Sequence, residues 1–341
     1  MARGGARGGR PPAKRSVDLS DSSGRGRRLK NILKYKDISI VIITIVFLSI
    51  FAMVSDKFLS RENIFIIIKT MPELGIVAIG MTMLIIAGEF DLSVGSTFAL
   101  APFIMAILNE RAGQNQILSL LACLVTGAAI GCINGLITTK IGIPSFITTL
   151  GTMMAWRGAV LLISAGFPQS FQRDLPVAKA FAGNISGFPV QFIWFVGFAV
   201  VMWVLLEHHR FGNWTYVTGG NKAAAVAMGI PVDRVKIINF MVLGGLSALA
   251  GAIQMFRMGS GYSIAGQGLE LQAIGATVIG GTLLSGGSGT MVGTLMGTII
   301  IFSIENIIVL SRAPAFWFRT FIGIIVIVAV SAHVLIQGRR S

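Results

Sequence analysis

Long apolar runs, interrupted by few charged residues, constrain this chain more than any other feature of its sequence. A helix needs roughly 20 mostly apolar residues to cross the hydrocarbon core of a membrane. Because 54% of the 341 residues are hydrophobic and only 12% are charged, with a mean hydropathy of +0.79, the composition is that of a membrane protein. The sequence predicts an all-α, polytopic membrane protein of about ten transmembrane helices, over residues 38–54, 63–87, 92–109, 117–138, 145–166, 191–207, 236–256, 270–286, 289–310 and 316–337.

Positive charge is concentrated at the two ends of the chain, whose formal net charge is +14. A nucleic-acid-binding tail is one interpretation of the basic residues 1–36. We favour the other, in which positive charge beside a first span, retained in the protein, holds the N-terminus in the cytoplasm. The Gly-, Arg-, Ser- and Pro-rich composition predicts a disordered tail. We therefore expect a disordered basic cytoplasmic tail over 1–36, a transmembrane domain over 37–341, both termini in the cytoplasm and no nucleic-acid partner.

The sequence lacks the patterns that hold metals or nucleotides. Cys123 and Cys132 lie nine residues apart in one predicted span, point to different helix faces and have no zinc-ligand spacing around them. There is no glycine-rich phosphate loop of the G-x-x-x-x-G-K-[ST] type and no nucleophile elbow. We therefore expect no catalytic residue, metal or cofactor in this chain, and any ATP and Mg must be bound by a partner.

Glycines spaced by four residues form two ladders, which are typical of helices that pack closely together. They are Gly127, Gly131 and Gly135 in the fourth predicted span, and Gly289, Gly293 and Gly297 in the ninth. A weak internal repeat also relates residues 78–82 to residues 273–277, and each copy runs into a glycine-rich segment. This indicates two related halves, as in many transporters. Whether they are parallel or inverted depends on the number of spans.

Residues 88–96, with the sequence G-E-F-D-L-S-V-G-S, place two carboxylates between two of the most apolar runs in the chain. The glycines permit backbone conformations that a helix interior does not use. Asp91 and Ser93 are poor residues for the middle of a helix but good caps, because their side chains accept hydrogen bonds from freed backbone N–H groups. We predict a helix break over 88–96, with Asp91 as the cap of a helix that starts near Leu92, and a second break over 280–289.

A single arginine, Arg157, lies near the middle of the fifth predicted span, where a charge is costly and usually faces a partner or a water-filled cavity. Glu89, Asp91 and Glu305 are the acidic residues that can meet it. An ion pair that fixes helix packing and a contact with a transported solute explain Arg157 equally well. The candidate residues for the break and the pathway are Glu89, Asp91, Ser93, Gly95 and Arg157.

The longest polar stretch between predicted spans is 208–235, which six spans would place in the cytoplasm. Within it, Asn221 is a good N-cap, the residues up to Met228 favour helix, and Gly229 and Pro231 end it. This pattern predicts a short surface helix. Because so short a helix is marginal in water by itself, something must pack against it, either the rest of the chain or a partner.

Four blocks of the chain, in order, resemble the permease subunits of bacterial ATP-binding-cassette sugar importers of the ribose, xylose and galactoside branch. The first block is the break itself, which resembles a G-x-D-L-S-V-G-S signature. The second is P-S-F-I-T-T-L-G at 144–151, followed by Arg157. The third is the cytoplasmic segment 211–236, and the fourth is the V-I-G-G-T stretch with the glycines that follow it, over 273–290. The resemblance covers residues 38–337.

The resemblance implies a transport complex in the inner membrane. Two permease subunits, either two copies of this chain or this chain and a paralogue, form the path for a monosaccharide, a pentose or a hexose. A periplasmic binding protein delivers the sugar, and ATPase subunits that hold ATP and Mg dock on the cytoplasmic segment. The residues that the resemblance assigns to ATPase coupling are Gly219, Gly220, Asn221, Lys222, Ala224, Ala225 and Gly229.

The chain departs from the family pattern at two places. Lys222 stands where the family commonly has an acidic residue, and Glu89 with Phe90 stands where it often has Gly-Ile. The alternative function is an ion-coupled secondary transporter or a channel for a small polar solute. Such a protein usually needs buried carboxylates, for which Glu89 and Asp91 qualify. A membrane-embedded enzyme finds no support, because the sequence has no nucleophile–base or metal constellation.

Overall fold

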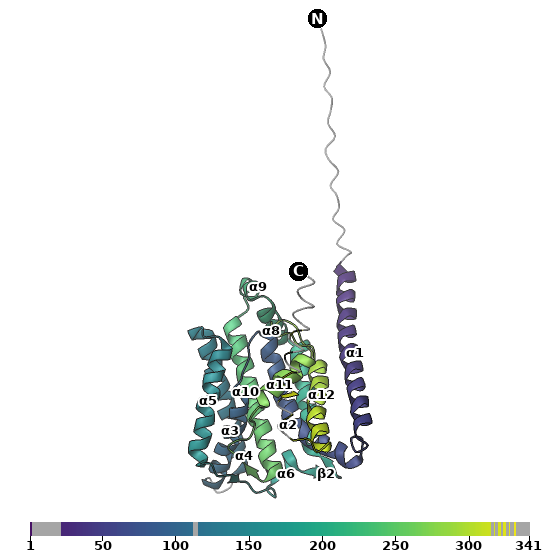
Figure 1. The fold of residues 1–341 in the computed structure, drawn as a ribbon. Coiled ribbons are helices and arrows are strands. Elements are labelled where there is room, and N and C mark those ends of the chain that lie inside the picture. Colours follow the sequence, from purple (N-terminus) through teal and green to yellow (C-terminus); the bar gives the residue numbers. More distant parts are fainter. Residues whose placement is uncertain are drawn as a thin grey trace.

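The computed structural model describes residues 1, 22–111 and 115–314 with a few isolated positions between 317 and 331, and only the backbone of residues 22–37. The chain forms a helical bundle with two minimal antiparallel ladders, β1–β4 and β2–β3 (Figure 1). The elements are α1 (Ser22–Val54), α2 (Arg61–Ile86), α3 (Val94–Arg111), α4 (Gln116–Leu136), the π-helix η2 (Ile137–Ile141), α5 (Ser145–Ser164), β1 (Gln169–Ser170), α6 (Pro176–Ala182), β2 (Asn184–Ile185), β3 (Phe188–Pro189), α7 (Val190–Glu207), α8 (Arg210–Gly220), α9 (Lys222–Ala227), α10 (Val232–Met258), β4 (Ser260–Gly261), α11 (Leu269–Ile279) and α12 (Met291–Leu310).

Short polar side chains and glycines set the ends of several helices. Asn115 Oδ1 accepts a hydrogen bond from the Leu118 N–H at 3.1 Å before α4, and Thr290 Oγ1 accepts one from the Gly293 N–H at 3.0 Å before α12. Each bond satisfies one of the free N–H groups of a first helical turn. At its other end, α10 stops at Gly259, whose φ of +74° suits glycine.

Among the described residues, six helices are long and apolar enough to cross a membrane: α2, α4 with η2, α5, α7, α10 and α12. The predicted count of about ten is therefore not confirmed. The 38–54 part of α1 and all of α11 are apolar but shorter. The span predicted over 270–286 is wrong, because α11 ends at Ile279 and its 11 residues reach only roughly 16 Å. The span predicted over 316–337 lies almost wholly outside the described residues.

The two ends of the bundle differ in what they carry. α1 begins at the same end of the molecule as α9, whereas α6 and β2 lie at the opposite end (Figure 1). α10 starts soon after α9 and leads to β4, which pairs with β1 near α6. The polar segment around α8 and α9 therefore lies at one end of the bundle, away from the ladders.

α10 is the central helix of the bundle, and it packs against α2, α3 and α4. The first glycine ladder lies on its contact with α4. A Cβ built on Gly127 would overlap the Gly244 carbonyl oxygen, and one built on Gly131 would overlap that of Phe240. Gly135 meets Ile237 in the same way. These glycines allow α4 and α10 to approach more closely than larger residues would permit.

The second ladder brings α12 against α11, but only two of its glycines lie on the helix. A Cβ on Gly293 would overlap the carbonyl oxygen of Gly280, and one on Gly297 would overlap that of Ala276. Gly289 precedes α12, which begins at Met291, so it belongs to the non-helical segment instead. The ladder predicted with three glycines on one helix therefore has only two, because the Thr290 cap starts the helix after the first glycine.

The helices that precede the two breaks end alike. Gly88 follows α2 with a φ of +83°, and Gly281 follows α11 with a φ of +88°. Each opens a non-helical segment, as the sequence predicted for both places. Because the likeness is limited to the helix ends, the two-half repeat stays a prediction.

The tail predicted to be disordered over 1–36 has a different boundary. The backbone of residues 22–36 is helical and continuous with the apolar part of α1, whereas residues 2–21 lie outside the described residues. A helix that is already nucleated extends at little cost through good helix formers such as Lys, Arg and Leu. The composition of residues 1–36 therefore predicted the end of the disordered tail too far along the chain, because the helix already begins at Ser22.

Replacing Gly131 with Leu tests the contact between α4 and α10. The added side chain must displace the Phe240 backbone, so we expect a loss of about 1–3 kcal/mol of stability from overpacking. Thermal unfolding of the detergent-solubilised protein measures the loss. Gly197→Leu on α7 is the matched control, because nothing lies within 4 Å of its Cβ position. Equal melting temperatures for the two variants would contradict this packing.

Candidate functional site

The break after α2 is held by a buried carboxylate. Asp91 Oδ1 accepts hydrogen bonds from the Ser93 N–H at 2.7 Å and the Ser93 hydroxyl at 2.6 Å, and Oδ2 accepts one from Asn134 Nδ2 at 3.1 Å. Asp91 is only 1% exposed. The helix begins at Val94 rather than near Leu92, so Asp91 closes the turn before the helix and does not cap its first turn. The helix therefore starts two residues later than predicted. The reason is that Asp91 accepts its hydrogen bond from the N–H of Ser93, which forms a turn before the helix.

Glu89, in the same break, forms an ion pair with Lys236 of α10. The two side chains are 12% and 13% exposed, so the pair is largely shielded from water. Lys236 was not among the candidate residues, although the sequence places it at the start of a predicted span. The pair ties the break to the beginning of α10.

Arg157 of α5 meets backbone carbonyls rather than the acidic residues predicted for it. Its Nη1 donates to the carbonyl oxygens of Ser263 at 2.6 Å and Ala265 at 2.9 Å, and its Nη2 donates to that of Gly95 at 2.9 Å. Gly95 lies in the first turn of α3, and the other two lie in the segment before α11. One guanidinium therefore connects the beginnings of the two short helices that follow irregular backbone.

Glycines bring both breaks and the end of α8 together in one junction. The Gly287 N–H donates to the Ile86 carbonyl oxygen at 2.8 Å, which links the second break to the end of α2. A Cβ on Gly219 would overlap that same oxygen, and one on Gly286 would lie 2.9 Å from Gly88 Cα. Gly220 in turn faces Gly287. At Gly219, Gly286 and Gly287 the backbones approach too closely for a side chain, so the end of α8 is in direct contact with both breaks.

The short helix predicted in the cytoplasmic segment is present as α9. Asn221 Oδ1 accepts a hydrogen bond from the Ala224 N–H at 2.9 Å, and Gly229 takes a φ of +74° after the helix. Ala225 is fully buried against a small cluster that includes Ile230 and Val235. The chain itself therefore packs one face of α9.

The other face of α9 exposes apolar residues that sequence reasoning missed. Val226 is 59% exposed, Met228, the C-cap that follows α9, is 70% exposed, and Lys222 is also exposed. Ala224 and Ala225, which the resemblance assigned to coupling, are half-buried and buried, respectively. Which face of so short a helix is buried can be told only once the packing of Ala225 against Ile230 is known.

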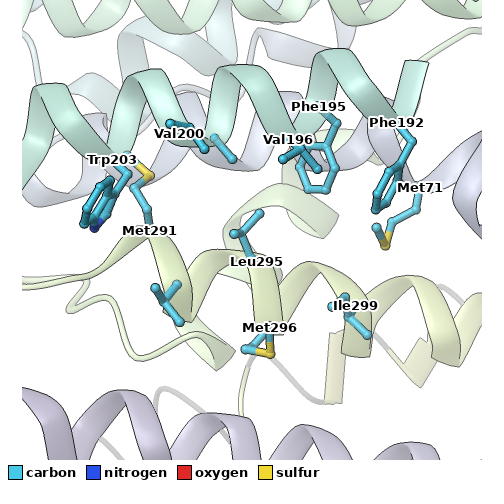
Figure 2. Close-up of a pocket in the computed structure, with 12 residues that line it drawn as sticks. Met71, Phe192, Phe195, Val196, Val200, Trp203, Met291, Leu295, Met296 and Ile299 are labelled. Atoms are coloured by element: carbon cyan, nitrogen blue, oxygen red, sulfur yellow. The ribbon is translucent and has the colours of Figure 1, made fainter. Parts of the chain in front are cut away.

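Two cavities flank α12 and differ in chemistry. An apolar groove of about 270 Å³ lies between α7 and α12, with Phe195 and Trp203 on one side and Leu295 and Met296 on the other (Figure 2). A second cavity of about 370 Å³, between α2, α10, α11 and α12, is lined by polar side chains that include Glu73, Arg257 and Glu305. Apolar walls suit hydrocarbon, so only the second cavity offers hydrogen bonds to a polar solute.

Other polar contacts between the helices escaped sequence reasoning. Glu73 of α2 accepts hydrogen bonds from Arg257 Nε at 2.6 Å and from Gln254 Nε2 at 3.0 Å. Asn63 and Asn306 exchange hydrogen bonds at 2.8 and 2.9 Å. An intramembrane carboxylate such as Glu73 indicates that a partner exists. Its partner Arg257 lies 184 residues away in the sequence, so no local pattern identifies it. As for metals, no group of His, Cys, Asp and Glu suited to hold an ion occurs in the described ranges.

Replacing Asp91 with Ala tests the hydrogen bonds in the first break. Three donors from Ser93 and Asn134 lose their acceptor, and each unsatisfied buried group costs about 1–3 kcal/mol. We expect much less folded, monodisperse protein after solubilisation, measured by size-exclusion chromatography. Asp174→Ala is the control, since the Asp174 side chain is 98% exposed. Normal folding with a loss of transport alone would instead make Asp91 a pathway residue.

Reversing charges tests the ion pair between Glu89 and Lys236. Glu89→Lys and Lys236→Glu each leave a shielded charge beside a like charge, which costs about 3–5 kcal/mol. We expect each single variant to give little folded protein and the double variant to recover most of it, measured by the same chromatography. A double variant that is no better than the single ones would mean that these two groups do not act as a pair.

Comparison with known proteins places the chain among transport permeases, as the resemblance of its four sequence blocks predicted. Residues 63–330 match the family described as branched-chain amino acid transport system / permease component. The chain is 38% identical to the ribose import permease protein of Bacillus subtilis, over 82% of this chain and 87% of that one. It is 34% identical to the xylose/arabinose import permease protein of Sulfolobus acidocaldarius, over 89% and 86%, respectively. A third relative, 32% identical over 89% of this chain and 90% of its own, is the autoinducer 2 import system permease protein of Photorhabdus luminescens.

No solved structure matches the chain significantly. The family match covers most of the sequence, including both breaks, Arg157 and the segment around α9. The relatives named above are transport components and not enzymes. With its several apolar helices, the chain is a multi-pass membrane protein that belongs to this family of transport-system permease components.

Proposed function

We propose that the chain is the permease subunit of an ATP-binding-cassette importer and forms the path for a monosaccharide, a pentose or a hexose. The names of its relatives, ribose and xylose/arabinose import permeases, support this substrate class. The observation that carries the proposal is the glycine junction, where the end of α8 contacts both helix breaks. Energy delivered to α8 and α9 therefore has a direct route to the segments that interrupt the membrane helices.

The driving partner is an ATPase subunit that docks on α9 and holds the ATP and Mg. Val226 and Met228 offer an exposed apolar surface at the end of the bundle, beside the charged Lys222. Exposed apolar side chains grouped on one short helix are typical of a protein–protein contact. Gly219, Gly220, Asn221 and Gly229 then shape the docking helix, and Ala224 and Ala225 pack it on the permease.

The end of the bundle that carries α9 faces the cytoplasm of the cell whose plasma membrane holds the protein. Lys140, Lys222 and Arg234 lie at this end, as the positive-inside rule requires. The six candidate spans and four further segments then give about ten membrane-embedded segments, in two related halves. The four are the 38–54 part of α1, α3, α11 with its break, and residues 316–337. Both termini are then cytoplasmic, and a sugar-binding protein meets the opposite end, around α6 and β2.

A second permease subunit, a copy or a paralogue, packs against α5. α5 is the least buried of the six candidate spans, with only 17% of its most apolar window buried within this chain. Gly151 and Gly158 on α5 have no atoms within 4 Å of their Cβ positions, which leaves room for close approach of another helix. The path then lies between two subunits in the bilayer.

The alternative, an ion-coupled secondary transporter or a channel, has less support. The two carboxylates proposed for ion coupling are both engaged, Glu89 by Lys236 and Asp91 by Ser93 and Asn134. The relatives are named as import permeases, and one in Escherichia coli as a probable ABC transporter permease protein, which supports the importer instead.

Replacing Val226 or Met228 with Asp tests the docking surface. A charge in an apolar contact must be buried without a partner, so we expect the ATPase to stop co-purifying with the permease and sugar uptake to cease. Uptake of labelled sugar by cells and co-purification from detergent measure the two effects. Ile185→Asp at the opposite end, where Ile185 is 61% exposed, is the matched control for co-purification.

Two results would contradict the proposal. Uptake driven by an ion gradient in cells that lack the ATPase would favour the secondary transporter. Normal co-purification of the ATPase with both Asp variants would place the docking surface elsewhere on the permease.

A further inference from the structure

A hollow of about 340 Å³ lies beside α9, where η2 and the start of α10 adjoin it, and we call it the α9 hollow. Part of its lining is apolar and consists of Val226, Pro231 and Val232. The remainder is charged and consists of Lys140, Lys222, Asp233 and Arg234. Val226 also belongs to the exposed apolar surface proposed for docking, so the hollow and that surface are continuous.

The two helices beside the α9 hollow are fixed to each other by apolar packing. A buried cluster joins α9 to the beginning of α10 and consists of Ala225, Ile230, Val232 and Val235. Since Val232 both belongs to this cluster and lines the hollow, the wall of the hollow is continuous with packed protein. The hollow is therefore formed before a partner binds, which lowers the cost of ordering on association.

Positive charge exceeds negative charge around the α9 hollow. Lys140 and Asp233 form an ion pair at 2.6 Å, so these two charges offset each other. Lys222 and Arg234 are exposed, and within the described ranges neither side chain has a hydrogen-bond or ion-pair partner. Two unpaired cations beside one hollow create a positive potential there, which attracts an anionic group.

Positive charge at this end of the bundle does not by itself identify a partner, because the positive-inside rule enriches Lys and Arg in cytoplasmic loops generally. Arg210 is an example, since it is exposed at the same end, lies 5.9 Å from the Trp214 ring and does not line the hollow. Lys222 and Arg234 differ from it because they flank exposed apolar side chains. An apolar centre with a charged rim is the usual anatomy of a protein–protein interface.

We infer that the α9 hollow receives an acidic segment of the ATPase subunit, which presents an apolar side chain together with carboxylates. The apolar side chain contacts Val226 and Pro231, and the carboxylates pair with Lys222 and Arg234. The inference rests on the proposed function and adds to it the chemistry of the partner surface. Apolar contact then supplies affinity, whereas the charges speed association and disfavour an ATPase that has basic residues at that place.

Charge reversal gives the first test, with the full-length permease in lipid nanodiscs and the ATPase that co-purifies with the wild type. Lys222→Glu and Arg234→Glu keep the apolar surface but repel carboxylates, so we expect the affinity for the ATPase to fall about tenfold or more. Both positions lie in the first turn of a helix, where Glu is favourable, so the variants fold. Surface plasmon resonance measures the affinity, and size-exclusion chromatography verifies folding.

Two controls accompany the charge reversal. Arg210→Glu changes an exposed cation outside the hollow and leaves the affinity nearly unchanged. Lys222→Arg keeps the positive charge and binds as the wild type does. Since salt screens exposed charges, association of the wild type weakens as the salt concentration rises, and that of the Glu variants weakens less.

Chemical cross-linking gives a second readout, which identifies the groups in contact. A water-soluble carbodiimide activates a carboxylate, which then forms an amide with a neighbouring lysine amine while the carbodiimide leaves as a urea. We expect mass spectrometry of the treated complex to find a peptide that joins Lys222 to an Asp or Glu of the ATPase. Lys222→Arg still forms the complex but loses this cross-link, because the reaction needs the lysine amine.

The outcomes separate this inference from the proposed function. Wild-type affinity in both Glu variants, or wild-type association that salt does not weaken, overturns the acidic partner. Docking on α9 then stands or falls separately, with Val226→Asp. Tighter association of the Glu variants means that the ATPase surface is basic instead. Failure of any ATPase to co-purify with the wild type, together with uptake driven by an ion gradient, overturns the function itself.

Discussion

Backbone groups that leave a helix inside a membrane must find partners within the protein, because lipid offers none and each unsatisfied group costs several kcal/mol. In this chain, one side chain meets much of that need. Arg157 donates to three carbonyls, one in the first turn of α3 and two in the segment before α11. A guanidinium carries five N–H donors in a rigid plane and remains charged, which suits this position better than any other residue. The placement of both short helices therefore depends on a residue of a third helix.

The same constraint explains the other polar residues of the membrane region. Asp91 joins the first break to Asn134 of α4, and Glu89 joins it to Lys236 of α10. Each carboxylate receives at least one contact from outside its own segment, so the irregular backbone is supported by its neighbours. Glu305 is half-buried, faces a cavity and has no such partner among the described residues.

The sequence predicted several features because their signals are local. Asn221 and Gly229 marked the ends of α9, and the glycines after α2 and α11 marked both breaks. It failed where the deciding contact is distant. Lys236 lies 147 residues from Glu89, and any carbonyl in the chain is a possible partner for Arg157. The span over 270–286 was also misjudged, because apolar length was followed there although the glycines of the predicted break at 280–289 already end the helix. The face that α9 exposes was likewise decided by the burial of Ala225.

The sequence by itself determined that this chain enters a membrane, that its helices are broken at two places and that a short helix lies between two spans. Hydrophobicity, glycine content and capping residues act over a few neighbours, so they can be read along the chain. Only the tertiary structure decided that both breaks meet the end of α8, that Arg157 binds carbonyls, and that a polar cavity lies beside α12. These features depend on close approach of segments far apart in sequence. That approach is set by packing of the whole bundle, which no local pattern encodes.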